Sequence, residues 1–171
     1  MRIGLFFGSF NPVHIGHLIL AQSAIDMACL DQVWFVVSPG SPDKDYSKLL
    51  HEFDRYDLVF AAIRDNPSFR VSDVEFSLPR PSYTYLTLRK LREKYPEEQF
   101  QILMGADNLI NFHKWDKWRL ISQKCNIIVF DRHGYKKKSL NSTTFKRLNN
   151  KNLIFIEFDK VNISSSQLRK I

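Results

Sequence analysis

The sequence predicts an α/β fold in three layers, with a mainly parallel sheet and helices on both faces. Short apolar runs recur along the chain, and most are continuous rather than alternating, as in strands buried on both faces. Segments with apolar residues at helical spacing separate these runs, which indicates βαβ units with right-handed crossovers. The 171 residues, 44% of them apolar, suit one globular domain spanning residues 1–171.

Five apolar runs are the expected strands. They are short and rich in β-branched and aromatic residues, which favour extended structure. The runs cover residues 2–7, 32–37, 100–104, 126–130 and 153–158.

Three segments between these runs carry apolar residues on one helical stripe, and each stripe is expected to face the sheet. The first stripe is Ile15, Leu18, Ile19 and Ile25, the second is Tyr56, Val59, Phe60 and Ile63, and the third is Leu88, Leu91 and Tyr95. Residues 38–50 are rich in Pro, Ser and Gly, so they are expected to form a loop.

The charge and the cysteines restrict the class of ligand and the compartment. A formal net charge of +7 favours phosphorylated ligands, nucleic acid or anionic surfaces. Cys29 and Cys125 lie in apolar contexts without metal-binding spacing, so we expect buried free thiols in a reducing compartment. The sequence shows neither a secretory leader pattern nor a run approaching the ~20 apolar residues of a membrane span. We therefore expect a cytoplasmic protein with no membrane partner.

The stretch LFFGSFNPVHIGHL, residues 5–18, joins the first expected strand to the first expected helix. Gly8 lets the backbone approach a ligand closely, Ser9 offers a hydroxyl and an N–H, and an Asn-Pro pair makes the turn. The helix is expected to start near Val13 or His14, and its N-terminus has unpaired N–H groups that suit a phosphate. His14 and His17 project from the first turn on one face, within reach of phosphate oxygens.

Two other interpretations of the histidines are open. A zinc site needs further ligands, and neither an HExxH pattern nor a Cys/His cluster supplies them, so no metal ligand is predicted. Alternatively, one histidine caps the helix and the other packs against the core. The stretch is neither a Walker loop nor the GxGxxG dinucleotide fingerprint.

Four blocks of the sequence carry a family resemblance. GSFNPVHIGHL resembles the GxFxPxHxGH signature of the adenylyltransferase and cytidylyltransferase superfamily, whose members share a Rossmann-like fold. PRPSYTYLTL (79–88), GADNLINFHKW (105–115) and ISSSQLRK (163–170) are similar, in order and spacing, to blocks of the bacterial nicotinate-nucleotide adenylyltransferases. The resemblance implies an enzyme of NAD biosynthesis that transfers AMP from ATP to nicotinate mononucleotide, giving deamido-NAD and pyrophosphate. Mg²⁺ is expected to be carried on the ATP phosphates.

The resemblance also implies an ATP site. Its catalytic residues are expected to be His17, His14 and Arg169, with His17 the first choice. Three serines at a helix start supply caps and an anion nest, and an Arg one turn later adds charge-assisted hydrogen bonds. The expected ATP-binding residues are Gly8, Ser9, Phe10, His14, His17, Lys44, Arg132, Ser164, Ser165, Ser166 and Arg169.

The mononucleotide site is expected to have three parts. Backbone N–H groups of Tyr83, Thr84 and Tyr85, at a helix start, would receive the nicotinate carboxylate, which favours the acid over the neutral amide. Gly105 and Asp107 follow the strand 100–104, where the carboxylate can accept from a ribose hydroxyl. The alternative is that Asp107 only caps a helix.

The third part is an aromatic platform, because the family stacks an aromatic ring on the nicotinate at the position of Trp115. Trp118 is interpreted as core packing rather than as a ligand contact. The chain departs from the family pattern at Leu86, where Asp is usual.

Rival functions remain open at this stage. Another adenylyltransferase would use nicotinamide mononucleotide or phosphopantetheine as the acceptor. A non-catalytic nucleotide- or RNA-binding module would keep the fold and the charge, but the sequence lacks an RNP1-type aromatic platform, so no nucleic-acid partner is expected. A homo-oligomer is left open.

Overall fold

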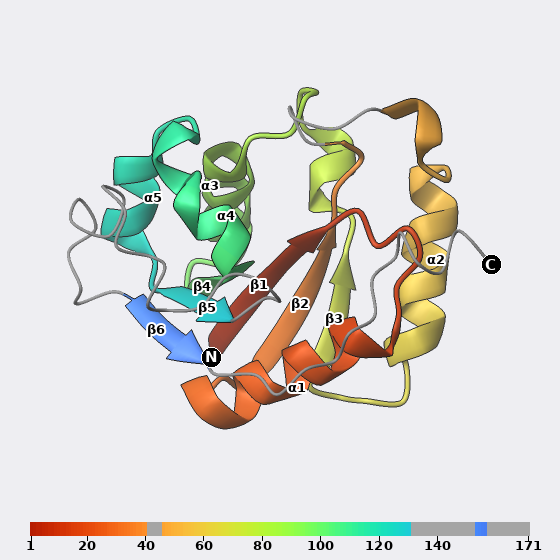
Figure 1. The fold of residues 1–171 in the computed structure, drawn as a ribbon, viewed down its shortest axis with the longest axis horizontal. Coiled ribbons are helices and arrows are strands. Elements are labelled where there is room, and N and C mark those ends of the chain that lie inside the picture. Colours follow the sequence, from red (N-terminus) through yellow and green to blue (C-terminus); the bar gives the residue numbers. More distant parts are fainter. Residues whose placement is uncertain (41–45, 131–152, 157–171) are drawn as a thin grey trace.

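The computed structural model describes residues 1–40, 46–130 and 153–156, which form a six-stranded parallel sheet. The strand order is β3-β2-β1-β4-β5-β6, and each neighbouring pair is parallel (Figure 1). The α/β Rossmann-like class is thereby confirmed. The strands are β1 Arg2–Gly8, β2 Gln32–Val37, β3 Phe69–Ser72, β4 Gln99–Gly105, β5 Ile127–Phe130 and β6 Leu153–Ile156.

Helices cover both faces of this sheet. The α-helices are α1 Ile15–Ala28, α2 Glu52–Ile63, α3 Thr84–Lys94, α4 Ala106–Ile110 and α5 Trp118–Lys124. Short 3₁₀ turns lie at η1 Tyr46–Lys48, η2 Val74–Ser77 and η3 Phe112–Lys114. The three layers follow from the alternation of strand and helix along the chain.

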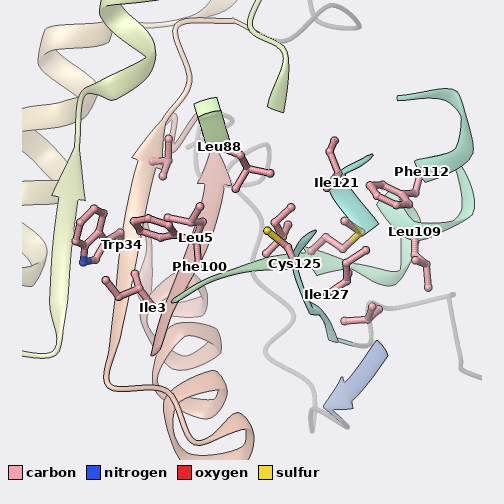
Figure 2. Close-up of a cluster of buried hydrophobic side chains, with 14 of the residues drawn as sticks. Ile3, Leu5, Trp34, Leu88, Phe100, Leu109, Phe112, Ile121, Cys125 and Ile127 are labelled. Carbon is pink, nitrogen blue, oxygen red and sulfur yellow. The ribbon is translucent and has the colours of Figure 1, made fainter. Parts of the chain in front are cut away.

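Two hydrophobic cores result because successive strand side chains point to opposite faces. On β1, Leu5 packs with α3, α4 and α5, and Figure 2 shows this core, which also contains Trp34 and Phe112. Phe6 joins the other core, which is formed with α1 and α2.

The predicted buried stripe of α1 is wrong at two of its four residues, while Leu18 and Ile25 pack against the core. Ile15 and Ile19 are 53% and 36% exposed, whereas Ala21 and Ala24 lie against the sheet. Small side chains let this helix approach the strands closely, and the apolar pattern alone does not reveal that preference. On α2 the stripe is wrong at Phe60, which is exposed, because the buried side of the helix continues through Arg55.

The strand β3 was not predicted from the sequence. Its four residues, FRVS, alternate between apolar and polar because it is an edge strand that pairs only with β2. The run 32–37 matches β2, and the run 126–130 starts one residue before β5. Residues 157–158 of the last predicted strand lie outside the described residues.

Both cysteines are free, but only one is buried. Cys125 lies in the core, and its burial raises the pKa of the thiol. Cys29 is exposed, contrary to the prediction, because it is the C-cap of α1 in a left-handed conformation, with φ 53°. Of the helices described, none combines the length and the apolar character that crossing a membrane requires.

The strand order places a switch point between β1 and β4. From β1 the chain moves outward to β2 and β3, then returns to pair β4 on the other side of β1. Ligands of such sheets bind beyond the carboxyl ends of the strands at this point. The segments that follow β1 and β4 are therefore where a site is expected.

Candidate functional site

The loop after β1 has a backbone shape that depends on Gly8 and Phe10. Phe10 has a left-handed φ of 47° and is 2% exposed, with its ring packed against Phe6 and Phe35. A Cβ on Gly8 would lie 3.0–3.2 Å from three atoms of that ring. The glycine therefore accommodates the Phe10 ring. The Phe10 side chain belongs to the core, which leaves its backbone to face a ligand.

His14 and His17 come together at the start of α1. Their rings stack with centroids 3.8 Å apart and planes 27° from parallel. His14 occupies the N-cap position, and its backbone N–H donates to Nδ1 of His17 at 3.1 Å. The helix starts at Ile15, so both histidines also have a capping role in the first turn.

This hydrogen bond fixes the tautomer of His17. An imidazole that accepts at Nδ1 carries its proton at Nε2 when it is neutral. The His17 ring also packs edge-on against Phe10, with centroids 5.0 Å apart, and against Phe6 at 5.9 Å. The ring is thus held by Phe6 and Phe10, and in this tautomer Nε2 is the donor nitrogen of the ring.

Asp107 follows β4, the strand next to β1 at the switch point. The N-cap of α4 is Gly105, and Asp107 is the second residue of the helix. The alternative in which Asp107 is the helix cap is therefore wrong. The carboxylate lies in the first turn of α4, partly buried, at the carboxyl edge that the β1 loop also occupies.

The start of α3 provides backbone donors. Tyr83 is the N-cap in an extended conformation, and its carbonyl accepts from Leu86 N at 3.1 Å and from Thr87 N at 3.3 Å. The N–H groups of Thr84 and Tyr85 precede these first intrahelical bonds, so they belong to the set that a helix leaves unpaired at its N-terminus. The Lys117 ammonium lies 4.4 Å from the centre of the Tyr85 ring and adds positive charge nearby.

Trp115 is partly buried at the end of η3. Its ring meets Phe112 edge-on, with centroids 5.2 Å apart, and Phe112 is fully buried. Trp118 also contacts Phe112, at 6.1 Å, and packs against the same core, as the sequence interpretation expected. One side of Trp115 is thus supported by the core.

Sequence reasoning missed two buried charged residues near these loops. Arg55 is 1% exposed, and each acceptor of its guanidinium in the described part of the chain is a backbone carbonyl. Burial lowers the pKa of Arg55, while Glu52 raises it and Arg80 lowers it further. The spacing of four between Arg55, Val59 and Ile63 is the signal that could have placed the arginine on the buried side of α2.

Glu75 is the second, at 2% exposure on η2. Thr87 Oγ1, on α3, donates to its Oε1 at 2.9 Å. Burial raises the pKa of the Glu75 carboxyl, while the hydroxyls of Ser38, Thr87 and Ser82 act in the opposite direction. This carboxyl therefore lies between the segment after β2 and the start of α3.

Six predicted site residues cannot be compared with the structure. They are Lys44, Arg132, Ser164, Ser165, Ser166 and Arg169, which lie outside the described residues. Within the described ranges, no three His, Cys, Asp or Glu side chains are grouped so that they could hold a metal ion.

A cavity of about 630 Å³ lies elsewhere, along the edge strand β3 between α2 and α3. Tyr56, Arg70 and Tyr95 are among its lining residues, and none of the predicted site residues lines it. Among the predicted residues that the structure describes, Gly8 ends β1 and Ser9 and Phe10 follow it, while Gly105 ends β4 and Asp107 lies in the first turn of α4.

Comparisons with known proteins identify the family and the fold of the chain. The model of the cytidylyltransferase-like family matches residues 5–171. A Cytophaga hutchinsonii protein named probable nicotinate-nucleotide adenylyltransferase is 44% identical over 171 residues, covering 100% of this chain and 85% of that protein. A Pelagibacter ubique protein of the same name is 41% identical, covering 99% of this chain and 93% of its own length. The solved nicotinic acid mononucleotide adenylyltransferase of Plasmodium falciparum, complexed with NaAD, shares the fold with a TM-score of 0.79 at 23% identity, over 99% of this chain and 82% of that chain.

Proposed function

The chain belongs to the cytidylyltransferase-like family, among its nicotinate-nucleotide adenylyltransferases, and we propose here how its residues carry out the reaction. The enzyme transfers the AMP moiety of ATP to nicotinate mononucleotide and releases pyrophosphate, which makes deamido-NAD for NAD biosynthesis. The observation that carries the residue assignment is the stacked pair His14 and His17, fixed at the start of α1 beside the switch point.

The reaction needs no enzyme nucleophile. The 5′-phosphate of the mononucleotide attacks the α-phosphorus of ATP in line, the bond to the β-phosphate oxygen breaks, and pyrophosphate leaves. Such transfers are accelerated mainly by positioning and by neutralising charge in the transition state. The Nε2–H of His17 is suited to donate to an α-phosphate oxygen, since Nδ1 is occupied by the backbone of His14.

The ATP phosphates would lie against the loop after β1. Gly8, Ser9 and the backbone of Phe10 line this loop, and the N-terminus of α1 adds a partial positive charge. Lys44, Arg132, the serines 164–166 and Arg169 stay in the proposal as ATP ligands on the basis of the sequence blocks. Arg169 is retained as a catalytic residue with His14 and His17.

The mononucleotide would bind on the other side of the switch point. Tyr83, Thr84 and Tyr85 would receive the nicotinate carboxylate with backbone N–H groups, and Lys117 beside Tyr85 favours an anion there. Gly105 and Asp107 would bind the ribose, and Trp115 would stack on the ring. Leu86 replaces the usual Asp at the second residue after Thr84, so the carboxylate nest would rest on backbone donors alone.

Mg²⁺ would be carried by the ATP phosphates. The chemistry of the ion supports this, because Mg²⁺ commonly keeps several waters while it is bound to phosphates. When bound, the ion would supply charge neutralisation at the departing pyrophosphate. We further propose that residues 1–171 act as one cytoplasmic domain.

The test is pyrophosphate release with ATP, Mg²⁺ and either nicotinate or nicotinamide mononucleotide. We expect turnover with the acid and a kcat/KM at least about tenfold lower with the amide, since one lost charge-assisted interaction at a helix terminus accounts for that ratio. Equal use of both substrates would refute the carboxylate nest at α3. If neither mononucleotide leads to the release of pyrophosphate, the enzymatic assignment is refuted.

A further inference from the structure

Arg55 is a buried cation whose hydrogen-bond acceptors, among the described residues, are backbone carbonyls. Its Nε donates to Leu50 O at 2.9 Å, Nη1 donates to both Ser9 O and Ser38 O at 2.7 Å, and Nη2 donates to Pro39 O at 3.3 Å. Within the described residues no carboxylate forms an ion pair with it. The guanidinium therefore joins three chain segments that are distant in sequence.

Stability alone does not explain an arginine at this position. A buried charge carries a large desolvation penalty, and apolar residues of similar volume commonly replace such groups without loss of stability. What an apolar residue lacks is the planar fork of donors, which fixes the relative positions of several acceptors at once. In this structure the acceptors of the fork lie in the loop after β1, in the segment after β2 and directly before α2.

The segments joined by Arg55 belong to the proposed site. Ser9 lies in the loop after β1 that leads to the two histidines at the start of α1, and Figure 1 shows this loop running beside α2. Ser38 and Pro39 directly follow β2, and Ser38 N also donates to Gly8 O at 2.9 Å. Arg55 thus holds the loop after β1 through a hydrogen bond to the backbone carbonyl of Ser9, rather than through a side chain of that loop.

The connection continues to the start of α3. Gly40, next to Pro39, accepts a hydrogen bond from Ser82 N at 3.3 Å, and Ser82 immediately precedes the N-cap of α3. The segment 38–40 consequently touches both the loop proposed for the ATP phosphates and the helix start proposed for the nicotinate carboxylate.

We propose that Arg55 is a positioning residue that aligns the two halves of the active site. It holds the loop after β1 in register with residues 38–40, so that the attacking phosphate and the α-phosphorus meet in line. This inference rests on the proposed function. Because misplacement of reacting groups by about 1 Å can cost about 10²-fold in rate, the loss should appear in kcat more than in the KM of either substrate.

Three variants test the proposal. Arg55→Met removes every donor at similar length, and Arg55→Lys keeps the charge and part of the hydrogen bonding. Arg92→Met is the matched control, because Arg92 also donates to a carbonyl, Lys124 O at 2.7 Å, but at the amino edge of the sheet. Steady-state pyrophosphate release is measured below the melting transition of each variant, with folding verified by near-ultraviolet circular dichroism.

We expect kcat to fall about 10²-fold in Arg55→Met and about tenfold in Arg55→Lys, with each KM changing less than about threefold and the control staying near wild type. A merely structural role of Arg55 would lower the melting temperature of both Arg55 variants and leave the kcat of the folded protein unchanged. If Arg55→Met does not fold, Arg55→Lys decides, and a folded variant with wild-type kcat overturns the proposal.

Hydrogen exchange gives a readout that does not depend on turnover. The amides of the loop after β1 and of Ser38 and Gly40 should exchange faster in the Arg55 variants, and their exchange should be unchanged in Arg92→Met. Unchanged exchange in the Arg55 variants overturns the proposal even if the wild type is active. A wild type that releases no pyrophosphate, with exchange altered as expected, refutes the proposed function and leaves the positioning role of Arg55 in the loop.

Discussion

Replacing Gly8 by alanine tests how tightly the loop after β1 is packed. The added Cβ would lie 3.0, 3.1 and 3.2 Å from three atoms of the Phe10 ring, whereas carbon atoms in contact prefer about 3.5–4.0 Å. The ring would have to retreat by roughly 0.5 Å. Phe6, Phe35 and His17 surround it with centroids 5.5, 5.5 and 5.0 Å away, so no open side receives the displacement.

The expected magnitude follows from that geometry. Overfilling a closely packed core costs about 1–3 kcal/mol, and we expect Gly8→Ala to lower the free energy of unfolding by an amount in this range. The displaced Phe10 ring presses on His17, whose imidazole we propose as the donor to the α-phosphate. A displacement of about 1 Å can lower the rate about 10²-fold, so a displacement of about half that distance is expected to lower kcat about tenfold.

Gly4→Ala is the control on the same strand. Gly4 lies in the amino half of β1, and its Cβ would lie 2.5 Å from Cδ1 of Leu103 on β4 and 2.7 Å from Cδ1 of Leu30 before β2, both of which end flexible side chains. Urea unfolding should show a loss of stability in both variants, and pyrophosphate release should be impaired only in Gly8→Ala. A Gly8→Ala protein with wild-type stability and kcat would show that the packing argument is wrong.

The other predictions concern single groups of the site. His17→Ala should lower kcat by about 10²-fold or more while the protein stays folded by circular dichroism, and an unchanged kcat would remove His17 from catalysis. Trp115→Ala should raise the KM for nicotinate mononucleotide about tenfold and leave the KM for ATP unchanged, because one stacked ring contributes about 0.5–1.5 kcal/mol beyond its buried area; equal effects on both substrates would contradict the stacking role. Glu75→Gln tests the raised pKa of the buried carboxyl. The folded state binds its proton more tightly than the unfolded state, so wild-type stability falls as the pH rises from the ordinary glutamate pKa of 4.5 through the raised pKa of the folded state. Urea unfolding should therefore show the stability of the variant gaining on that of the wild type as the pH rises above 4.5, and a difference independent of pH would refute that titration.

The strands were predictable from the sequence where burial on both faces makes the apolar run continuous. The run at 32–37 coincides with β2 for this reason. The edge strand β3 was missed because its alternating polarity over four residues gives too weak a pattern. On α1 the apolar stripe was misleading, since Ala21 and Ala24 pack closely on the sheet and the larger Ile15 remains exposed.

The candidate site residues that the structure describes were predicted from motifs. The buried charged residues that contact their segments were not predicted. The pattern around His14 and His17 is local in sequence, so it is visible without a structure. Arg55 and Glu75 act through contacts with segments 12 to 46 residues away, and charged residues are ordinarily expected on the surface. Only the spacing of Arg55 from Val59 and Ile63 hinted that this face of α2 is buried.

The arrangement of layers explains why such supports are needed. The loop carrying the histidines leads into α1, which packs on one face of the sheet, whereas α3 packs on the opposite face. The two proposed substrate sites are therefore built on different layers, and only a segment that crosses the strand ends can fix one relative to the other. Residues 38–40 do so, through Gly8, Arg55 and Ser82. Since in-line transfer depends on the relative position of the two phosphates, the alignment of this segment should limit the rate more than the affinity of either site alone.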